Sequence, residues 1–206
     1  MKKKKTSFHA KEFHRGILLF IALAFAVGGL AGCIFAGAVS GTGTQAISSH
    51  IEAFLAGIQG DSLSPPGLLA ASWSVLRWPV ILMLLSVTSI GLICIPILFF
   101  ARGFLFAFCI ASFVRVLGSS GALFAILLLG VESLLTISAL FVLGIHGLTL
   151  ASWTSEERRK CGGLRSYWHD PALALRHGIC LIVFSFCIIW EMFLGPILLS
   201  SAAALF

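Results

Sequence analysis

The chain of 206 residues is 59% apolar and only 11% charged, with a mean hydropathy of +1.05. A soluble domain needs polar outer faces on its helices, so this composition excludes one and predicts a single integral membrane domain surrounded by membrane lipids. The net charge of +6 is concentrated ahead of the first apolar run, in Lys2 to Lys5, Lys11 and Arg15, which indicates attraction to anionic lipid head groups and not to nucleic acid.

The first predicted element is a membrane span over residues 16–39, preceded by a basic cytoplasmic tail over residues 1–15. The apolar run is longer than the core of a signal peptide, so we interpret it as a retained span, with cleavage after its small residues at 36–38 as the alternative. Small residues recur here at every fourth position and share one helix face, where another helix can approach closely. Either the protein's own spans or a partner's helix would pack on that face. Its residues are Ala24, Gly28, Gly32 and Ala36.

Residues 40–77 are polar enough to leave the membrane and form a predicted extracytoplasmic loop. Trp73 and Trp78 stand near its end, where aromatic residues anchor a span at the interface. Earlier in the loop, apolar residues at helical spacing alternate with polar ones, which predicts a short amphipathic helix that lies in the membrane interface. The apolar face of this helix consists of Ile47, Ile51, Phe54, Leu55 and Ile58.

The remaining apolar sequence predicts four more spans, which gives an all-α membrane helix bundle of about five transmembrane helices. Pro96 is expected to kink the second span. The third span is short for a hydrocarbon core of roughly 30 Å, and a glycine-serine break at residues 118–121 separates it from the fourth. These spans are predicted at residues 78–100, 103–117, 122–150 and 178–199, with a cytoplasmic loop at 151–177.

The placement of lysine and arginine predicts the orientation of the spans. With the N-terminus in the cytoplasm, twelve basic residues face inwards and only Arg77 and Arg115 face outwards, so the C-terminus lies outside. Arg115 is expected to snorkel to the outer surface. We therefore predict a multi-pass protein of the cell membrane. The inward-facing residues are Lys2, Lys3, Lys4, Lys5, Lys11, Arg15, Arg102, Arg158, Arg159, Lys160, Arg165 and Arg176.

Two acidic residues fall inside predicted spans, Glu132 in the fourth and Glu191 in the fifth. A carboxylate near the middle of a membrane is costly, so each must be protonated, paired or turned towards a wet cavity. In one hypothesis the two acids mark an ion path. In the other they are neutral acids that donate hydrogen bonds to neighbouring helices.

The sequence carries none of the catalytic motifs that fit a membrane protein of this size. It has no asparagine, which excludes an HxxxN signature, and it has no GxSxG elbow, HExxH motif or glycine-rich phosphate loop. His177 and Cys180 share a helix face, but two ligands do not make a metal site. We predict a protein that is not an enzyme and that holds no metal or cofactor.

The order of features in the chain is similar to that of a known family. A basic N-terminus, a glycine-rich span and an external amphipathic helix are followed by a proline-bearing stretch from Pro96 to Gly103 and by a hairpin with Glu132. This layout resembles the stage II sporulation protein M family. The resemblance implies a non-catalytic scaffold that recruits membrane-anchored peptidoglycan hydrolases, a transglycosylase and an amidase, to the septum for engulfment during endospore formation. The alternative is a small transporter or permease-like subunit that uses Glu132 and Glu191. Homo-oligomerisation stays open.

Overall fold

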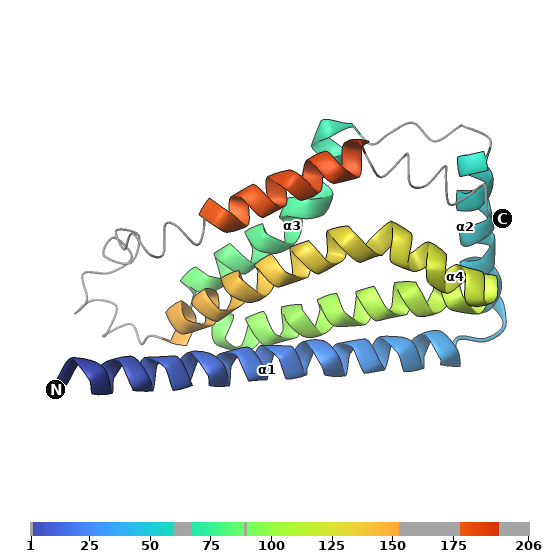
Figure 1. Cartoon of the computed structure of the whole chain (residues 1–206). Coiled ribbons are helices and arrows are strands. Elements are labelled where there is room, and N and C mark those ends of the chain that lie inside the picture. The colour runs from blue at the N-terminus through green and yellow to red at the C-terminus, as the bar shows by residue number, and fades with distance from the viewer. Residues whose placement is uncertain (1, 60–66, 89, 153–177, 194–206) are drawn as a thin grey trace.

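The computed structural model describes residues 2–59, 67–88, 90–152 and 178–193, and every regular element among them is a helix. α1 lies along one side of α4, α3 and the 178–193 helix lie on the other side, and α2 runs across one end of this bundle (Figure 1). The predicted all-α architecture is therefore confirmed at the level of a helix bundle. The helices are α1 (Lys2–Ala38), α2 (Thr42–Gln59), α3 (Leu68–Val87), α4 (Gly91–Ser152) and the helix Gly178–Phe193.

α4 is a hairpin of two arms and not one straight helix. Gly118 has φ of 66° and ψ of −143°, a combination that residues with a Cβ atom avoid. The chain reverses there, so residues 91–117 form a first arm and residues 119–152 a second arm (Figure 1). The rings of Phe113 and Phe124 are 5.4 Å apart and those of Phe99 and Phe141 are 5.0 Å apart, so the arms run antiparallel. The predicted break at residues 118–121 is confirmed.

α1 lies along the first arm and runs in the same direction. A Cβ atom at Gly28 would overlap the backbone carbonyl of Phe100, and one at Gly32 would overlap that of Phe104. On the facing helix, Gly103 is equally close to the backbone of α1. Small residues allow two helix backbones to approach in this way. The small-residue face of α1 therefore packs against the protein's own α4.

α3 and the 178–193 helix cover the other side of α4. One core cluster joins side chains from α1, α3, both arms and the 178–193 helix, and Phe99, Leu140 and Phe184 are fully buried within it. Because lipid tails are as apolar as these side chains, the cluster holds the helices together by close packing and not by exclusion of water.

The predicted boundaries of the second and third spans are wrong. α3 covers Leu68–Val87 and α4 begins at Gly91, so the chain turns inside the span predicted at 78–100, and the loop predicted at 40–77 contains the start of α3. Near the end of α3, the hydroxyl of Ser86 donates to the carbonyl oxygen of Met83 at 2.7 Å, and the hydroxyl of Thr88 donates to that of Leu85 at 2.9 Å. Such local bonds compete with the helix and help to end it. The span predicted at 103–117 gains the residues from 91 onwards and is no longer short.

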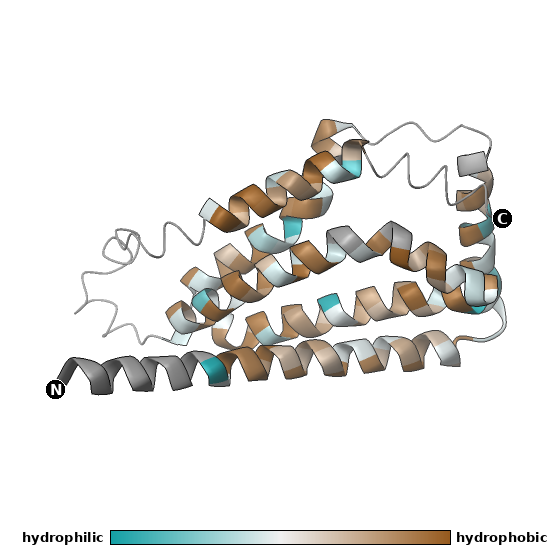
Figure 2. Ribbon diagram, in the orientation of Figure 1, coloured by the Kyte–Doolittle hydropathy of each residue, from teal (hydrophilic) through white to brown (hydrophobic). Residues whose placement is uncertain are grey.

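The outer faces of the bundle are apolar. Figure 2 shows brown, hydrophobic residues along most of each long helix. Leu19, Ile34 and Leu84 are 70%, 72% and 68% exposed, and they are representative of many large apolar side chains that point outwards. A surface of this kind requires lipid as its solvent, so the chain is a multi-pass membrane protein. The 178–193 helix is apolar but shorter than four stretches that can cross a membrane, which are Arg15–Ala38, Leu68–Val87, Gly91–Ile126 and Ser133–Ser152.

Candidate functional site

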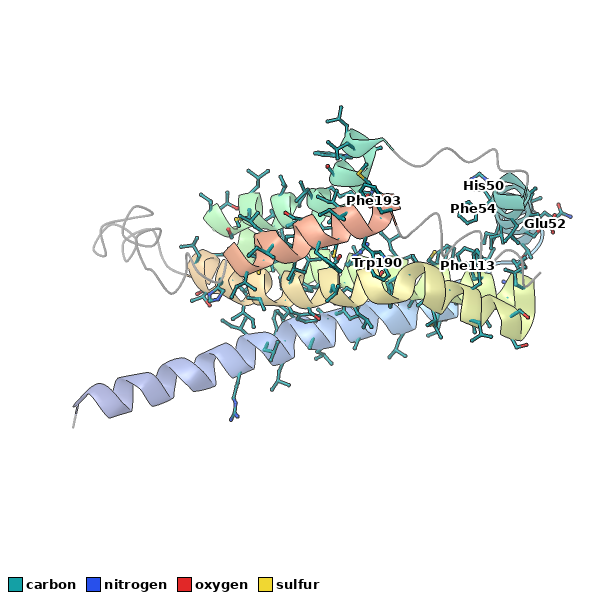
Figure 3. All side chains as sticks on the ribbon, turned by 45° about the horizontal axis from the view of Figure 1, so that its top comes forward. His50, Glu52, Phe54, Phe113, Trp190 and Phe193 are labelled. Atoms are coloured by element: carbon teal, nitrogen blue, oxygen red, sulfur yellow. The ribbon has the colours of Figure 1, made fainter. Side chains whose placement is uncertain are left out.

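α2 rests on the tip of the α4 hairpin, which we define as residues 109–125 around the reversal. Ile51 is buried, and Phe54 packs with it against Phe113 and Phe124. Figure 3 shows Phe54 on the side of α2 that faces the bundle and Glu52 on its far side. The predicted amphipathic helix is therefore present, and its apolar face contacts protein. The same cluster includes Ile47 and Leu55, whereas the side chain of Ile58 lies outside the described residues.

Arg115 joins three helices at the tip. One guanidinium nitrogen, Nη1, donates to the carbonyl oxygen of Ala36 at 2.6 Å, and Nη2 donates to the hydroxyl of Thr44 at 3.4 Å. A cation near the last carbonyls of α1 is favoured by the helix dipole. The side chain is exposed, and its two hydrogen bonds fix the turn between α1 and α2 to the first arm.

Arg102 lies inside the bundle and not in a cytoplasmic loop, so that prediction is wrong. It follows Phe100 and precedes Phe104, the residues that contact Gly28 and Gly32, and is thus level with the middle of the apolar part of α1. Its guanidinium lies 5.3 Å from the centre of the Trp78 ring, which attracts the cation through its π face. The predicted interfacial role of Trp78 is also wrong, because its ring packs against the core.

Further polar contacts lie near this pair. The hydroxyl of Ser74, one turn before Trp78, donates to the Glu191 carboxyl oxygen at 2.7 Å. One turn before Glu191, the Cys187 sulfur accepts a bond of 3.5 Å from the Thr136 hydroxyl. The turn from Ser74 to Trp78 belongs to α3, and the turn from Cys187 to Glu191 belongs to the 178–193 helix. Because both helices pack on α4, the polar groups of these turns and of α4 form one layer across the bundle. The polar layer consists of Ser74, Trp78, Arg102, Thr136, Cys187 and Glu191.

The other predicted site residues have different outcomes. Glu132 lies in the second arm, but its side chain is outside the described residues, so a path shared with Glu191 stays a prediction. On the small-residue face, Gly28 and Gly32 are buried, Ala36 is 2% exposed and Ala24 is half-buried. Of the two hypotheses for this face, packing against the protein's own spans is the one that the structure shows.

Two observations limit the chemistry of the described residues. Within ranges 2–59, 67–88, 90–152 and 178–193, no group of three histidine, cysteine or acidic side chains could hold a metal ion. The polar layer presents a cation, a carboxyl group and hydroxyls, which suit helix contacts or the passage of a charged solute. Of this layer, sequence reasoning predicted only Glu191, although an arginine within a long apolar run is itself a signal of an interior charge. The members that it missed are Ser74, Trp78, Arg102, Thr136 and Cys187.

No family model, no curated protein and no solved structure matches the chain.

Proposed function

We propose that this protein is a non-catalytic membrane scaffold that recruits extracytoplasmic peptidoglycan hydrolases through α2. The observation that carries the proposal is the position of α2 across the end of the bundle, with its apolar face on the tip and Glu52 and His50 exposed. A helix held in this way presents a rigid polar surface beside the membrane, where the membrane-proximal part of a partner can dock. The resemblance to the stage II sporulation protein M family supports this partner class and a role in engulfment.

The charge distribution supports an extracytoplasmic position for α2. Arg102 and Arg77 lie within helices that can cross the membrane, so neither belongs to a loop. Without them, eleven basic residues remain on the proposed cytoplasmic side, and Arg115 alone remains on the other. Because loops rich in lysine and arginine stay in the cytoplasm, the N-terminus would be inside and α2 outside the cell membrane.

Phe54→Asp tests the proposal. A carboxylate between Ile51 and the Phe113–Phe124 pair should detach α2 from the tip at a cost of about 3 kcal/mol, while the spans still insert. We expect co-purification of the hydrolases from sporulating cells to fall at least about tenfold, since 1.4 kcal/mol already corresponds to that factor, and the septal localisation of the hydrolases to be lost. Phe54→Leu is the matched control, because it keeps the site apolar and should keep the partner. Wild-type recovery of hydrolases with Phe54→Asp would contradict recruitment through α2.

The polar layer favours a second candidate function, that of a small transporter or permease-like subunit. Arg102 and Glu191 place a cation and a carboxyl group inside the bundle, where charged residues commonly line solute paths. Purified protein in liposomes, with no partner present, distinguishes the two functions. Solute uptake that Glu191→Gln abolishes would replace the scaffold by the transporter, whereas an inactive wild-type protein that still binds hydrolases would support the scaffold.

A further inference from the structure

A cavity of about 550 Å³ lies between the second arm of α4 and the 178–193 helix. Its walls are almost entirely apolar and include Leu135, Val142, Ile145, Ile179 and Val183, with His146 towards the end of the arm. Val142 and Ile179 are 40% and 53% exposed, so the cavity opens sideways from the bundle. Since the outer faces of these helices are in contact with lipid, the cavity opens into the hydrocarbon core and not into water.

The size of the cavity distinguishes a lipid chain from a helix as its occupant. A helix about 10 Å wide fills about 80 Å³ for each Å of its length, so the cavity would hold less than two turns of a partner's span. By contrast, the volume falls within the range of about 300–1,000 Å³ that is usual for small-molecule sites. A single flexible acyl chain can occupy an apolar site of this volume, whereas a spanning helix would leave most of its length outside it.

The His146 end of the cavity is the basic end of the molecule. Gly91, at the start of the first arm, packs against Ala151 at the end of the second, and α1 runs parallel to the first arm. The N-terminus of α1 therefore lies at the same end, as Figure 1 shows. This part of α1 carries Lys2, Lys3, Lys4, Lys5, Lys11 and Arg15.

We propose that this cavity binds one acyl chain of an anionic phospholipid, whose head group lies at the His146 end. The apolar walls accept the chain, and the basic residues of α1 raise the local concentration of anionic head groups in the same leaflet. The site is independent of α2 and of any enzyme that the protein recruits. It makes the space between the second arm and the 178–193 helix a lipid-filled part of the bundle.

Native mass spectrometry of the full chain, released from nanodiscs into detergent, tests the proposal. The nanodiscs contain phosphatidylglycerol or phosphatidylcholine with identical acyl chains. We expect the wild type to retain about one phosphatidylglycerol per chain, and to retain phosphatidylcholine about fivefold less, because the basic residues of α1 at the same end of the molecule favour the anionic head group. Val142→Trp places an indole ring at the open side of the cavity, where it obstructs an acyl chain, and should lower phosphatidylglycerol retention about tenfold.

Leu123→Trp is the matched control, because Leu123 lies on the same arm, is 66% exposed and does not line the cavity. It should retain phosphatidylglycerol like the wild type. Ser138→Phe narrows the same cavity from an exposed position and replaces Val142→Trp if that variant does not fold. Wild-type protein without bound phospholipid, or equal retention by the cavity and control variants, would overturn the site. Equal retention of the two phospholipids would overturn the anionic head group, and a bound second copy of the chain in place of lipid would show a protein interface instead.

Discussion

α1 and the first arm of α4 pack backbone against backbone. At Gly28, Gly32 and Gly103 the helices are so close that there is no room for a Cβ atom. The opposite side of α4, which faces α3 and the 178–193 helix, is packed in another way. It contains the polar layer, the cavity of about 550 Å³ and a second apolar cavity of about 210 Å³. We call the side of α4 that faces α1 the close side, and the side that faces α3 and the 178–193 helix the open side. Both are apolar at their outer surfaces, so hydropathy alone does not distinguish them.

The difference between the sides indicates a division of roles. The close side holds α1 and the first arm as one unit, and Arg115 and the tip connect this unit to α2. A surface that recruits a partner benefits from such a rigid support, because little conformational entropy is then lost on binding. The open side tolerates a cation, a carboxyl group and unfilled space, which are the features expected where lipids or solutes enter a bundle.

Gly28→Leu should break the close side and have the largest effect. A leucine side chain would start from a Cβ atom that already overlaps the carbonyl of Phe100, and the helix backbone cannot move away without separating α1 from the first arm. We expect a loss of about 3 kcal/mol or more of unfolding free energy, measured by steric trapping in bicelles or by detergent-induced unfolding.

Gly37→Leu is the matched control for this variant. Gly37 lies on the same helix, but a Cβ atom there would meet no other atom within 4 Å. We expect its stability to stay within about 0.5 kcal/mol of the wild type. If Gly28→Leu were as stable as Gly37→Leu, then α1 would not be packed on the first arm, and its small-residue face would again be open to a partner's helix.

The sequence predicted the close side better than the open side. Small residues at every fourth position of α1 and the glycine-serine break at residues 118–121 are local signals. In the structure they correspond to the packing of α1 on the first arm and to the reversal at Gly118. The turn between α3 and α4 has no comparable signal, because its flanks are as apolar as the helices. Arg102 beside Gly103 resembles a loop, and its burial became evident only from contacts with Trp78 on another helix. The periodicity of α2 predicted its apolar face, but tertiary contacts determine that this face packs on the tip of α4.

Ser74→Ala should have a modest effect on the open side. It removes the bond of 2.7 Å to the Glu191 carboxyl group, and interhelical hydrogen bonds within membranes contribute about 0.6 kcal/mol on average. Glu191→Gln should cost less than Ser74→Ala, because an amide oxygen still accepts the bond. Ser185→Ala is the control, since that exposed hydroxyl bonds only within its own helix, to the carbonyl of Leu181. A loss as large as that of Gly28→Leu would contradict this expectation and would show that the polar layer stabilises the bundle as strongly as the close side.

Val80→Leu should have the smallest effect and compares the two sides most directly. Val80 lines the cavity of about 210 Å³ and is 44% exposed, so one further methylene group finds space there. Because leaving lipid for a protein cavity yields little transfer free energy, we expect a change within about 0.5 kcal/mol. Ala36→Val adds two carbon atoms on the close side, where Ala36 is 2% exposed, and should cost about 1–3 kcal/mol. Equal losses in Val80→Leu and Ala36→Val, measured in the same bicelles, would mean that the cavity is filled by protein and that the two sides of α4 are equally tight.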